Sequence, residues 1–260
     1  QSPAASGGRS VFLAEDADLL ELDHLTVVNK PVRAASFGGQ AEALHYSSDR
    51  GRLSVRDAAF FSEQDTILVK GYAWFYRSLI AGNVDFIWGT NRASLFEESE
   101  IRSVGDSAQP KGGGYIVQAP TVDSDGPGFV FLTTRLTRGP GPAGNDVPDG
   151  ASWLARPGPS GSGDKVVYVH CRMHTHIAPA GWSLPKTIAS GAEPGAGWGE
   201  YGSMDMHGKP LDLSRRVRGR VLALDEAARY ASRSRVFAGF DAGKGWNPAP
   251  ESAQEHRHSN

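Results

Sequence analysis

The sequence predicts an all-β protein folded as a parallel β-solenoid. Short strand-like runs recur along the chain, separated by polar residues or glycine. Val55, Tyr76 and Phe96 hold equivalent places in three of these runs, at offsets of 21 and 20 residues, which is about the length of one solenoid coil. The 32 glycines and 16 prolines among 260 residues favour many turns over long helices.

The strand-like runs share one shape: an alternating strand, a small or polar corner, and a short apolar return. Repeats of this kind bury their apolar faces only by stacking on one another, as the coils of a solenoid do. A β-sandwich also contains many short strands, but it need not keep so steady a spacing. In chain order the runs are 20–28, 53–61, 74–80, 94–101, 129–136 and 166–173.

Other stretches depart from the repeat. Segments 139–152 and 158–164 are rich in Gly, Pro and small polar residues, so we expect long surface loops there. The stretch 191–209 is also predicted to be irregular. Segment 211–250 loses the period and is predicted to be a C-terminal tail packed along the solenoid, with one helix near 225–231.

The bulk properties fit a single domain over residues 1–260, with 39% apolar and 22% charged residues and no convincing linker. The formal net charge of −2 argues against nucleic acid as the main partner. No run approaches the roughly 18 consecutive apolar residues of a membrane span, so none is predicted. Cys171 is the only cysteine, so no disulfide can form within the chain.

Two acidic segments carry the strongest functional signal. Asp65 and Asp85 lie 20 residues apart, each in a stretch of apolar or small residues. In a solenoid they would lie on neighbouring coils, roughly 5 Å apart at the backbone. Two carboxylates this close cannot both titrate normally, so we expect one to hold a proton near neutral pH. That division suits an acid/base working beside a nucleophile.

Several ordered segments make the chain resemble the pectin methylesterases of carbohydrate esterase family 8. Each segment alone is a weak signal, whereas their order and spacing together are specific. The resemblance implies a right-handed parallel β-helix and removal of methyl esters from methylated polygalacturonate (pectin). The segments are QAEAL at 40–44, QDT at 64–66, VDFIWG at 84–89, LARP at 154–157, HIAPAGW at 176–182 and GWNP at 245–248.

The resemblance implies a role for each matching residue. Asp85 corresponds to the nucleophile that attacks the ester carbonyl, and Asp65 to the acid that protonates methanol and then activates water. Gln40 and Gln64 correspond to the amide donors that stabilise the oxyanion. Arg156 corresponds to the arginine that holds the nucleophile. These residue types suit the chemistry, because a guanidinium favours an ionised partner and neutral amides can bind a developing oxyanion.

The substrate groove is expected to carry aromatic side chains. The resemblance assigns contacts with the polysaccharide to Trp88 and Trp182. Three positions differ from the family pattern. Gly158 follows the Arg-Pro pair and Leu68 follows QDT-Ile, where the family usually has aromatic residues, and Ala155 stands where glycine is usual. These differences leave the proposed chemical groups intact but alter the expected sugar-binding sites.

The resemblance also carries expectations about the whole protein. Family domains usually open with further strands before the first glutamine, so we expect the first coils to be missing from this chain or to belong to a separate chain. No cofactor and no metal are expected. The predicted partner is pectin, bound by a monomer that is secreted or periplasmic.

Simpler interpretations remain beside these. Asp65 and Asp85 could be corner residues that hydrogen-bond a turn, and Gln40 and Gln64 could form a structural amide ladder. The histidines and the cysteine within 170–176 suggest a zinc site, although the sulfur would point away from the histidine face. The alternative functions are a non-catalytic polysaccharide-binding solenoid and, last, a polysaccharide lyase.

Overall fold

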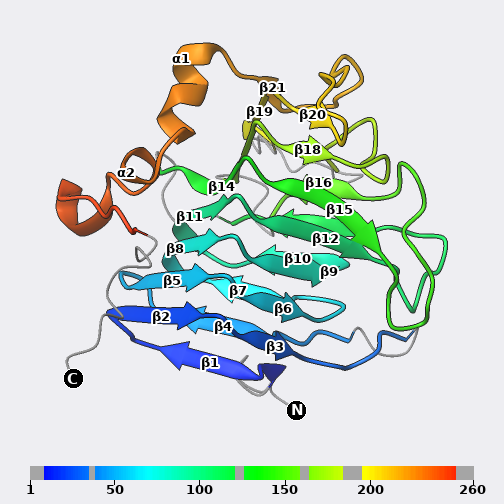
Figure 1. Cartoon of the computed structure of the whole chain (residues 1–260), viewed down its shortest axis with the longest axis horizontal. Coiled ribbons are helices and arrows are strands. Elements are labelled where there is room, and N and C mark those ends of the chain that lie inside the picture. The colour runs from blue at the N-terminus through cyan, green and yellow to red at the C-terminus, as the bar shows by residue number, and fades with distance from the viewer. Residues whose placement is uncertain (1–8, 35–38, 121–125, 159–163, 184–194, 250–260) are drawn as a thin grey trace, which may run out of the picture.

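The chain folds into three parallel β-sheets that wind around one interior (Figure 1). This computed structural model describes residues 9–34, 39–120, 126–158, 164–183 and 195–249. Successive strands along the chain belong to different sheets, and each sheet pairs strands from successive coils in parallel. This topology is a parallel β-helix, so the predicted solenoid is confirmed.

The three sheets differ in length. The first has six strands: β1 (Phe12–Glu15), β4 (Leu44–Ser47), β7 (Ile67–Val69), β10 (Val84–Trp88), β13 (Tyr115–Gln118) and β16 (Trp153–Arg156). The second has eight: β2 (Leu19–Asp23), β5 (Arg52–Arg56), β8 (Gly71–Tyr76), β11 (Asn91–Glu97), β14 (Gly128–Leu132), β17 (Lys165–Val169), β19 (Gly197–Tyr201) and β21 (Arg220–Val221). The third has seven: β3 (Thr26–Val28), β6 (Ala59–Phe61), β9 (Leu79–Gly82), β12 (Glu100–Val104), β15 (Arg135–Gly139), β18 (Arg172–Met173) and β20 (Met204–Asp205).

The predicted corner divides each strand-like run into a strand of the second sheet and a strand of the third. One residue at each corner adopts a left-handed backbone, and its side chain is exposed. The next residue points inward, where Ser78 and Ser99 hydroxyls donate to backbone carbonyls at 3.0 and 2.9 Å. Cys171 takes the same place, with its thiol 3.3 Å from a carbonyl oxygen. The corner residues are His24, Asp57, Arg77, Glu98, Thr133 and His170.

Aromatic rings stack through the interior from coil to coil. Phe96 lies between Phe75 and Phe131, with ring centroids 4.8 and 4.7 Å apart, and Tyr168 continues the column at 4.5 Å. These residues occupy paired register positions on β8, β11, β14 and β17. The equivalent of Val55 and Phe96 on the middle coil is therefore Phe75 and not the predicted Tyr76. The stack keeps equivalent residues of successive coils in line, which fixes where outward-facing residues lie.

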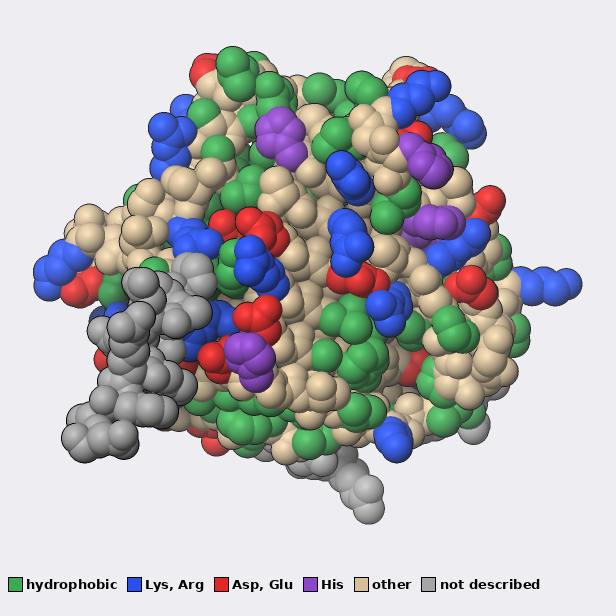
Figure 2. All heavy atoms as spheres, viewed as in Figure 1, with side chains coloured by type: hydrophobic (Ala, Val, Ile, Leu, Met, Phe, Trp, Pro, Cys, Tyr) green, Lys and Arg blue, Asp and Glu red, His purple; other side chains and the backbone are tan. Residues whose placement is uncertain are grey.

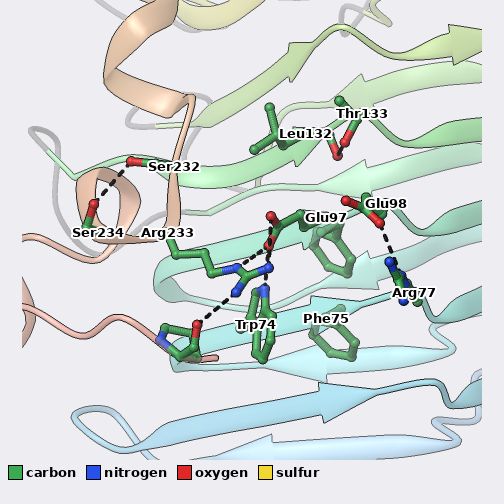
Figure 3. Close-up of polar contacts among 12 residues, drawn as sticks. Trp74, Phe75, Arg77, Glu97, Glu98, Leu132, Thr133, Ser232, Arg233 and Ser234 are labelled. Atoms are coloured by element: carbon green, nitrogen blue, oxygen red, sulfur yellow. Dashed lines mark hydrogen bonds and ion pairs between the residues drawn. The ribbon is translucent and has the colours of Figure 1, made fainter. Parts of the chain in front are cut away.

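The C-terminal segment packs along the second sheet, as predicted (Figure 1). It contains α1 (Leu224–Ala227), the 3₁₀ turn η2 (Ala228–Tyr230), α2 (Arg233–Val236) and η3 (Phe240–Gly243). Figure 3 shows its main polar attachment: Arg233 donates to both Glu97 oxygens, at 2.6 and 3.2 Å, and Trp74 donates to Glu97 at 2.8 Å. The Arg233 guanidinium also lies 4.5 Å from the Trp74 ring centroid.

The prediction that residues 191–209 are irregular is wrong. Within 191–209 the structure has β19 and β20, and Trp198 of β19 lies in the core. The run of Gly, Trp, Gly, Glu and Tyr in β19 lacks the β-branched residues typical of strands, so its pairing with β17 and β21 defines it. Loop 139–152 beyond Gly139 is irregular as expected, whereas most of 158–164 lies outside the described residues.

Figure 2 shows the side of the molecule that carries the second and third sheets. Acidic and basic side chains are interspersed there, without a large area of one sign. This agrees with the near-neutral net charge of −2. Among the described residues, no helix has the length and apolar character needed to cross a membrane.

Candidate active site

The candidate site lies along the first sheet, where three coils bring their polar residues into register. Gln40 forms an isolated parallel bridge with Gln64, and Gln64 forms another with Val84. The Asp65 amide donates to the Val84 carbonyl at 3.1 Å. The two aspartates therefore lie on neighbouring coils, and Gln40 lies on the coil before them.

Asp85 is turned out of the regular ladder by a β-bulge in β10. Between Val84 and Ile87 the register with β13 shifts by one residue, and Asp85 has a left-handed φ of 51°. Its side chain meets the end of β16, where Arg156 Nε donates to Oδ1 at 2.7 Å and Nη2 to Oδ2 at 2.5 Å. A guanidinium only donates, so Asp85 meets it as a doubly accepting carboxylate.

Asp65 lies next to Asp85 but in a different environment. It also has a left-handed φ, of 61°, and only 4% of it is exposed. Burial raises the pKa of Asp65 to about 7, and the negative charges of Asp85 and Glu42 act in the same direction. Asp65 therefore keeps a proton close to neutral pH, as the sequence analysis predicted for one member of the pair.

The two glutamines differ in their surroundings. Gln64 is buried, and its Oε1 has no hydrogen-bond partner among the described residues. Gln40 is exposed, and its Oε1 accepts a hydrogen bond from Arg9 Nη1 at 2.7 Å. Gln64 thus adjoins Asp65, and Gln40 is connected to the aspartate pair through Arg9, whose Nη1 lies 3.8 Å from Asp65 Oδ2.

A row of outward-facing side chains crosses the site on four neighbouring strands of the first sheet. It consists of Leu68 on β7, Trp88 on β10, Gln118 on β13 and Arg156 on β16, which occupy successive register positions. Trp88 is half-buried, and its Nε1 has no hydrogen-bond partner among the described residues. Neighbouring strands are about 4.8 Å apart, so this row runs across the sheet beside the Asp85–Arg156 pair.

Trp182 does not belong to this surface, which corrects the prediction that it contacts substrate. Only 2% of Trp182 is exposed, and its ring stacks on Trp198 with centroids 5.1 Å apart. Tyr168 lies against it at 5.9 Å. A ring packed in the core offers no face to a sugar. The segment that contains Trp182 therefore completes the interior column.

Some residues of the site were missed by the sequence analysis. Tyr115 begins β13, and its ring centroid lies 5.5 Å from the Arg156 guanidinium carbon. Arg9 and Glu42 form an ion pair at 2.7 Å next to Gln40. Glu42 lies in a segment quoted for the family resemblance, but its partner is 33 residues away and no local pattern joins them.

The described residues offer no metal-binding group in the site. Among the described residues, three possible ligand atoms come within 4.8 Å of one another only at Asp23, His24 and Asp57. These three residues are exposed and lie at a distant corner. The histidines and cysteine of 170–176 form no such group, so the zinc interpretation has no geometric support. Burial raises the pKa of Cys171 to about 12, which makes its thiol a poor nucleophile.

The arrangement can support covalent acyl transfer without a metal ligand set. Asp85 is an acceptor held by Arg156, and Asp65 beside it is a carboxyl that can donate and retake a proton. Amide groups of Gln40 and Gln64 are neutral donors near the pair. Most of these residues come from different coils, so only the stacking of the solenoid brings them together.

Comparison with known proteins identifies the family. The Pectinesterase family profile matches residues 10–236. "Probable pectinesterase/pectinesterase inhibitor 64" of Arabidopsis thaliana is 30% identical over 155 residues, 54% of this chain and 24% of that protein. "Probable pectinesterase 29" of Arabidopsis thaliana is 29% identical over 200 residues, 76% of this chain and 51% of that protein. The chain thus spans at most about half the length of these two relatives.

A solved structure shares the fold. The pectin methylesterase of Yersinia enterocolitica superposes with a TM-score of 0.68 over 91% of this chain and 79% of its own, at 22% identity. The common fold is the right-handed parallel β-helix expected from the sequence. Because the family profile covers most of the sequence, this chain belongs to the Pectinesterase family.

Proposed function

We propose that this protein is a carboxylic ester hydrolase that removes methyl esters from methylated polygalacturonate. The observation that carries the proposal is the pairing of Asp85 with Arg156, which lies two coils further on, beside the buried Asp65 on the coil before Asp85. Asp85 accepts both N–H groups of the guanidinium, whereas burial raises the pKa of Asp65, and this difference suits a nucleophile beside an acid.

In the first half of the reaction, Asp85 attacks the carbonyl carbon of the methyl ester. The carbonyl electron pair moves onto its oxygen, and the amide N–H groups of Gln40 and Gln64 stabilise that oxyanion. The intermediate then collapses and the bond to the methoxy group breaks. Asp65 donates its proton to this group, so methanol leaves and a covalent acyl-enzyme anhydride remains on Asp85.

In the second half, Asp65 is a carboxylate and acts as a base. It takes a proton from water while the oxygen of that water adds to the acyl carbon. The bond to Asp85 breaks, and the electron pair returns to its carboxylate. The free carboxyl group of the galacturonic acid residue, still within the polymer, leaves the site and ionises, and Asp65 is protonated for the next cycle.

The outer row of the first sheet is the proposed polysaccharide path. Trp88 is half-buried, and Tyr115 lies beside Arg156. Aromatic faces suit the apolar faces of sugar rings. Gly158 follows Pro157 without a side chain, and its amide donates to Asp164 at 3.1 Å. The aromatic side chain that the family pattern has at this position is therefore missing from the proposed path.

We also propose that the protein acts as a monomer outside the cytoplasm. Asp65, Asp85, Gln64 and Arg156 all come from one chain, and a polymer such as pectin is met outside the cell. Sedimentation of the purified protein as a dimer, or its recovery only from the cytoplasmic fraction, would contradict these two points.

The test is methanol release from methylated polygalacturonate, with the saponified polymer as control. We expect methanol from the methylated polymer alone. Saturable binding without methanol would replace the proposal with a non-catalytic binding module. Unsaturated products that absorb in the ultraviolet would replace it with a lyase.

A further inference from the structure

Arg9 lies at one end of the candidate site and contacts three of its polar groups. Its Nη1 donates to Gln40 Oε1 at 2.7 Å, and its Nη2 donates to Glu42 Oε1 at 2.7 Å. The same Nη1 is 3.8 Å from Asp65 Oδ2. Neither Arg9 nor Glu42 has a part in the proposed reaction, yet both touch residues that do.

The contact with Arg9 determines which end of the Gln40 amide faces the site. A guanidinium carries five N–H donors and no acceptor. It can therefore bond only to the oxygen of Gln40 and not to its NH₂ group. The two ends of a glutamine amide are nearly equal in shape, so an isolated Gln40 could turn either way. With Arg9 in place, the NH₂ group is the end left for other partners.

Glu42 fixes Arg9 in turn. Its side chain is wholly buried, and a buried carboxylate needs a cation or several donors to remain ionised. The backbone is held as well: Asn29 Nδ2 donates to the Arg9 carbonyl at 2.8 Å and to the Glu42 carbonyl at 2.9 Å. Val11, two residues after Arg9, donates its amide to the same Glu42 carbonyl at 3.0 Å.

We propose that Arg9, anchored by Glu42, is a positioning residue that orients Gln40 with its NH₂ group toward the oxygen of the reacting ester. The proposal rests on the proposed function, because it deepens the part given there to Gln40. It explains why an exposed glutamine, which alone would sample many orientations, can act as an oxyanion donor. At pH values where Asp65 is protonated, the effect of Arg9 on kcat passes through Gln40; separately, its charge lowers the pKa of Asp65.

A double-mutant cycle between Arg9→Ala and Gln40→Ala tests this. Removing one oxyanion donor lowers kcat by about 10²-fold or more, and loss of its orientation should cost about 10-fold, with KM within about twofold. If Arg9 acts through Gln40, adding Arg9→Ala to Gln40→Ala lowers kcat by less than about twofold. Losses that multiply would overturn the proposal.

Matched variants exclude a general effect of losing an arginine. Arg77→Ala removes an ion-paired arginine, 3.1 Å from Glu98 at a distant corner, and should leave kcat unchanged. Arg9→Lys keeps a donor and a charge, so it should recover part of the activity that Arg9→Ala loses. It also serves as the test variant if Arg9→Ala does not fold. No recovery by Arg9→Lys in a folded protein would count against the proposal.

Two readouts separate this proposal from the catalytic assignments. Arg9 also lowers the pKa of Asp65, so Arg9→Ala should shift the alkaline limb of kcat/KM upward even in the Gln40→Ala background. Retained activity in Asp85→Ala would refute the proposed function rather than the role of Arg9. In that case a neutron crystal structure of Arg9→Ala, which distinguishes the NH₂ group from the oxygen, decides: a rotated or disordered Gln40 amide supports the proposal, and an unchanged one overturns it.

Discussion

At the scale of single residues, Asp65 and Asp85 share a backbone conformation that most residues avoid. Their φ angles of 61° and 51° lie in the left-handed region, which costs an ordinary residue about 1–2 kcal/mol. Asp and Asn tolerate it best, because their short polar side chains can bond locally. An aspartate at each position thus suits both the local fold and the proposed chemistry, and Asn is the appropriate substitution.

Asp65→Asn should remove the acid of the reaction. We expect kcat to fall by about 10²–10⁴-fold, the usual contribution of a positioned acid or base. In the wild type, kcat/KM should decline as pH rises through about 7, because the folded pKa of Asp65 lies there and only the protonated form can donate. A flat pH profile up to pH 9, or an active Asp65→Asn, would contradict this role.

The same carboxyl should make stability depend on pH. The pKa of Asp65 is about 7 when folded and about 3.9 when unfolded, so its favourable contribution is complete below about pH 4 and is lost as pH rises to about 7. Asn does not titrate. We therefore expect the free energy of unfolding of Asp65→Asn, relative to wild type, to rise by roughly 2–4 kcal/mol from pH 4 to pH 8 in urea titrations. A difference independent of pH would contradict the raised pKa.

Trp88 and Trp182 should respond oppositely to truncation. Trp182→Ala opens the core beside Tyr168 and Trp198 and should lower the free energy of unfolding by about 3–5 kcal/mol. Trp88→Ala should instead raise KM, with a smaller loss of stability. Urea unfolding and steady-state kinetics measure both. A destabilised Trp88→Ala with normal KM would contradict the proposed contact of Trp88 with substrate. A stable Trp182→Ala with raised KM would restore the substrate contact first predicted for Trp182.

At the scale of elements, spacing predicts the coils only where the loops are short. The corners Asp57, Arg77 and Glu98 are 20 and 21 residues apart, and this made the period visible. The next corners, Thr133 and His170, are 35 and 37 residues further on, because long loops intervene. The strands of the first sheet are short and interrupted by polar site residues. Their alternation is therefore too weak to predict from sequence.

Arg233 should control how firmly α2 is attached to the second sheet. Lysine keeps the charge but loses the two-pronged contact with Glu97 and the stacking on Trp74. We expect Arg233→Lys to weaken the attachment by about 1–2 kcal/mol, which corresponds to about 10-fold faster hydrogen exchange of α2 amides such as those of Val236 and Phe237.

The control lies in the same helix. The one side-chain hydrogen bond described for Arg235 goes to the nearby Ala228 carbonyl and not to the second sheet. Arg235→Lys should therefore leave hydrogen exchange of the α2 amides nearly unchanged. Equal acceleration in both variants would show that Arg233 has no special part in the attachment. Acceleration across the whole second sheet would show that the fold, and not the docking, was disturbed.

At the scale of the whole molecule, stacking assembles the site from distant parts of the chain. Arg156 reaches Asp85 across 71 residues, and Arg9 reaches Gln40 across 31. Asp65, Asp85 and Arg156 could be predicted from the sequence because the family segments mark them. The Arg9–Glu42 pair could not, since no motif joins the two residues. The inward direction of Trp182 could not be predicted either, because an aromatic residue after Gly181 suits either side.

The central claim is that Asp85 is the nucleophile of a methyl esterase, and methanol release by Asp85→Asn tests it most directly. Asn tolerates the left-handed backbone, so the variant should fold. With methylated polygalacturonate, we expect the wild type to release methanol and folded Asp85→Asn to release at least about 10³-fold less, since an amide cannot form the acyl-enzyme. Methanol release by Asp85→Asn within about 10-fold of the wild-type rate would contradict the claim.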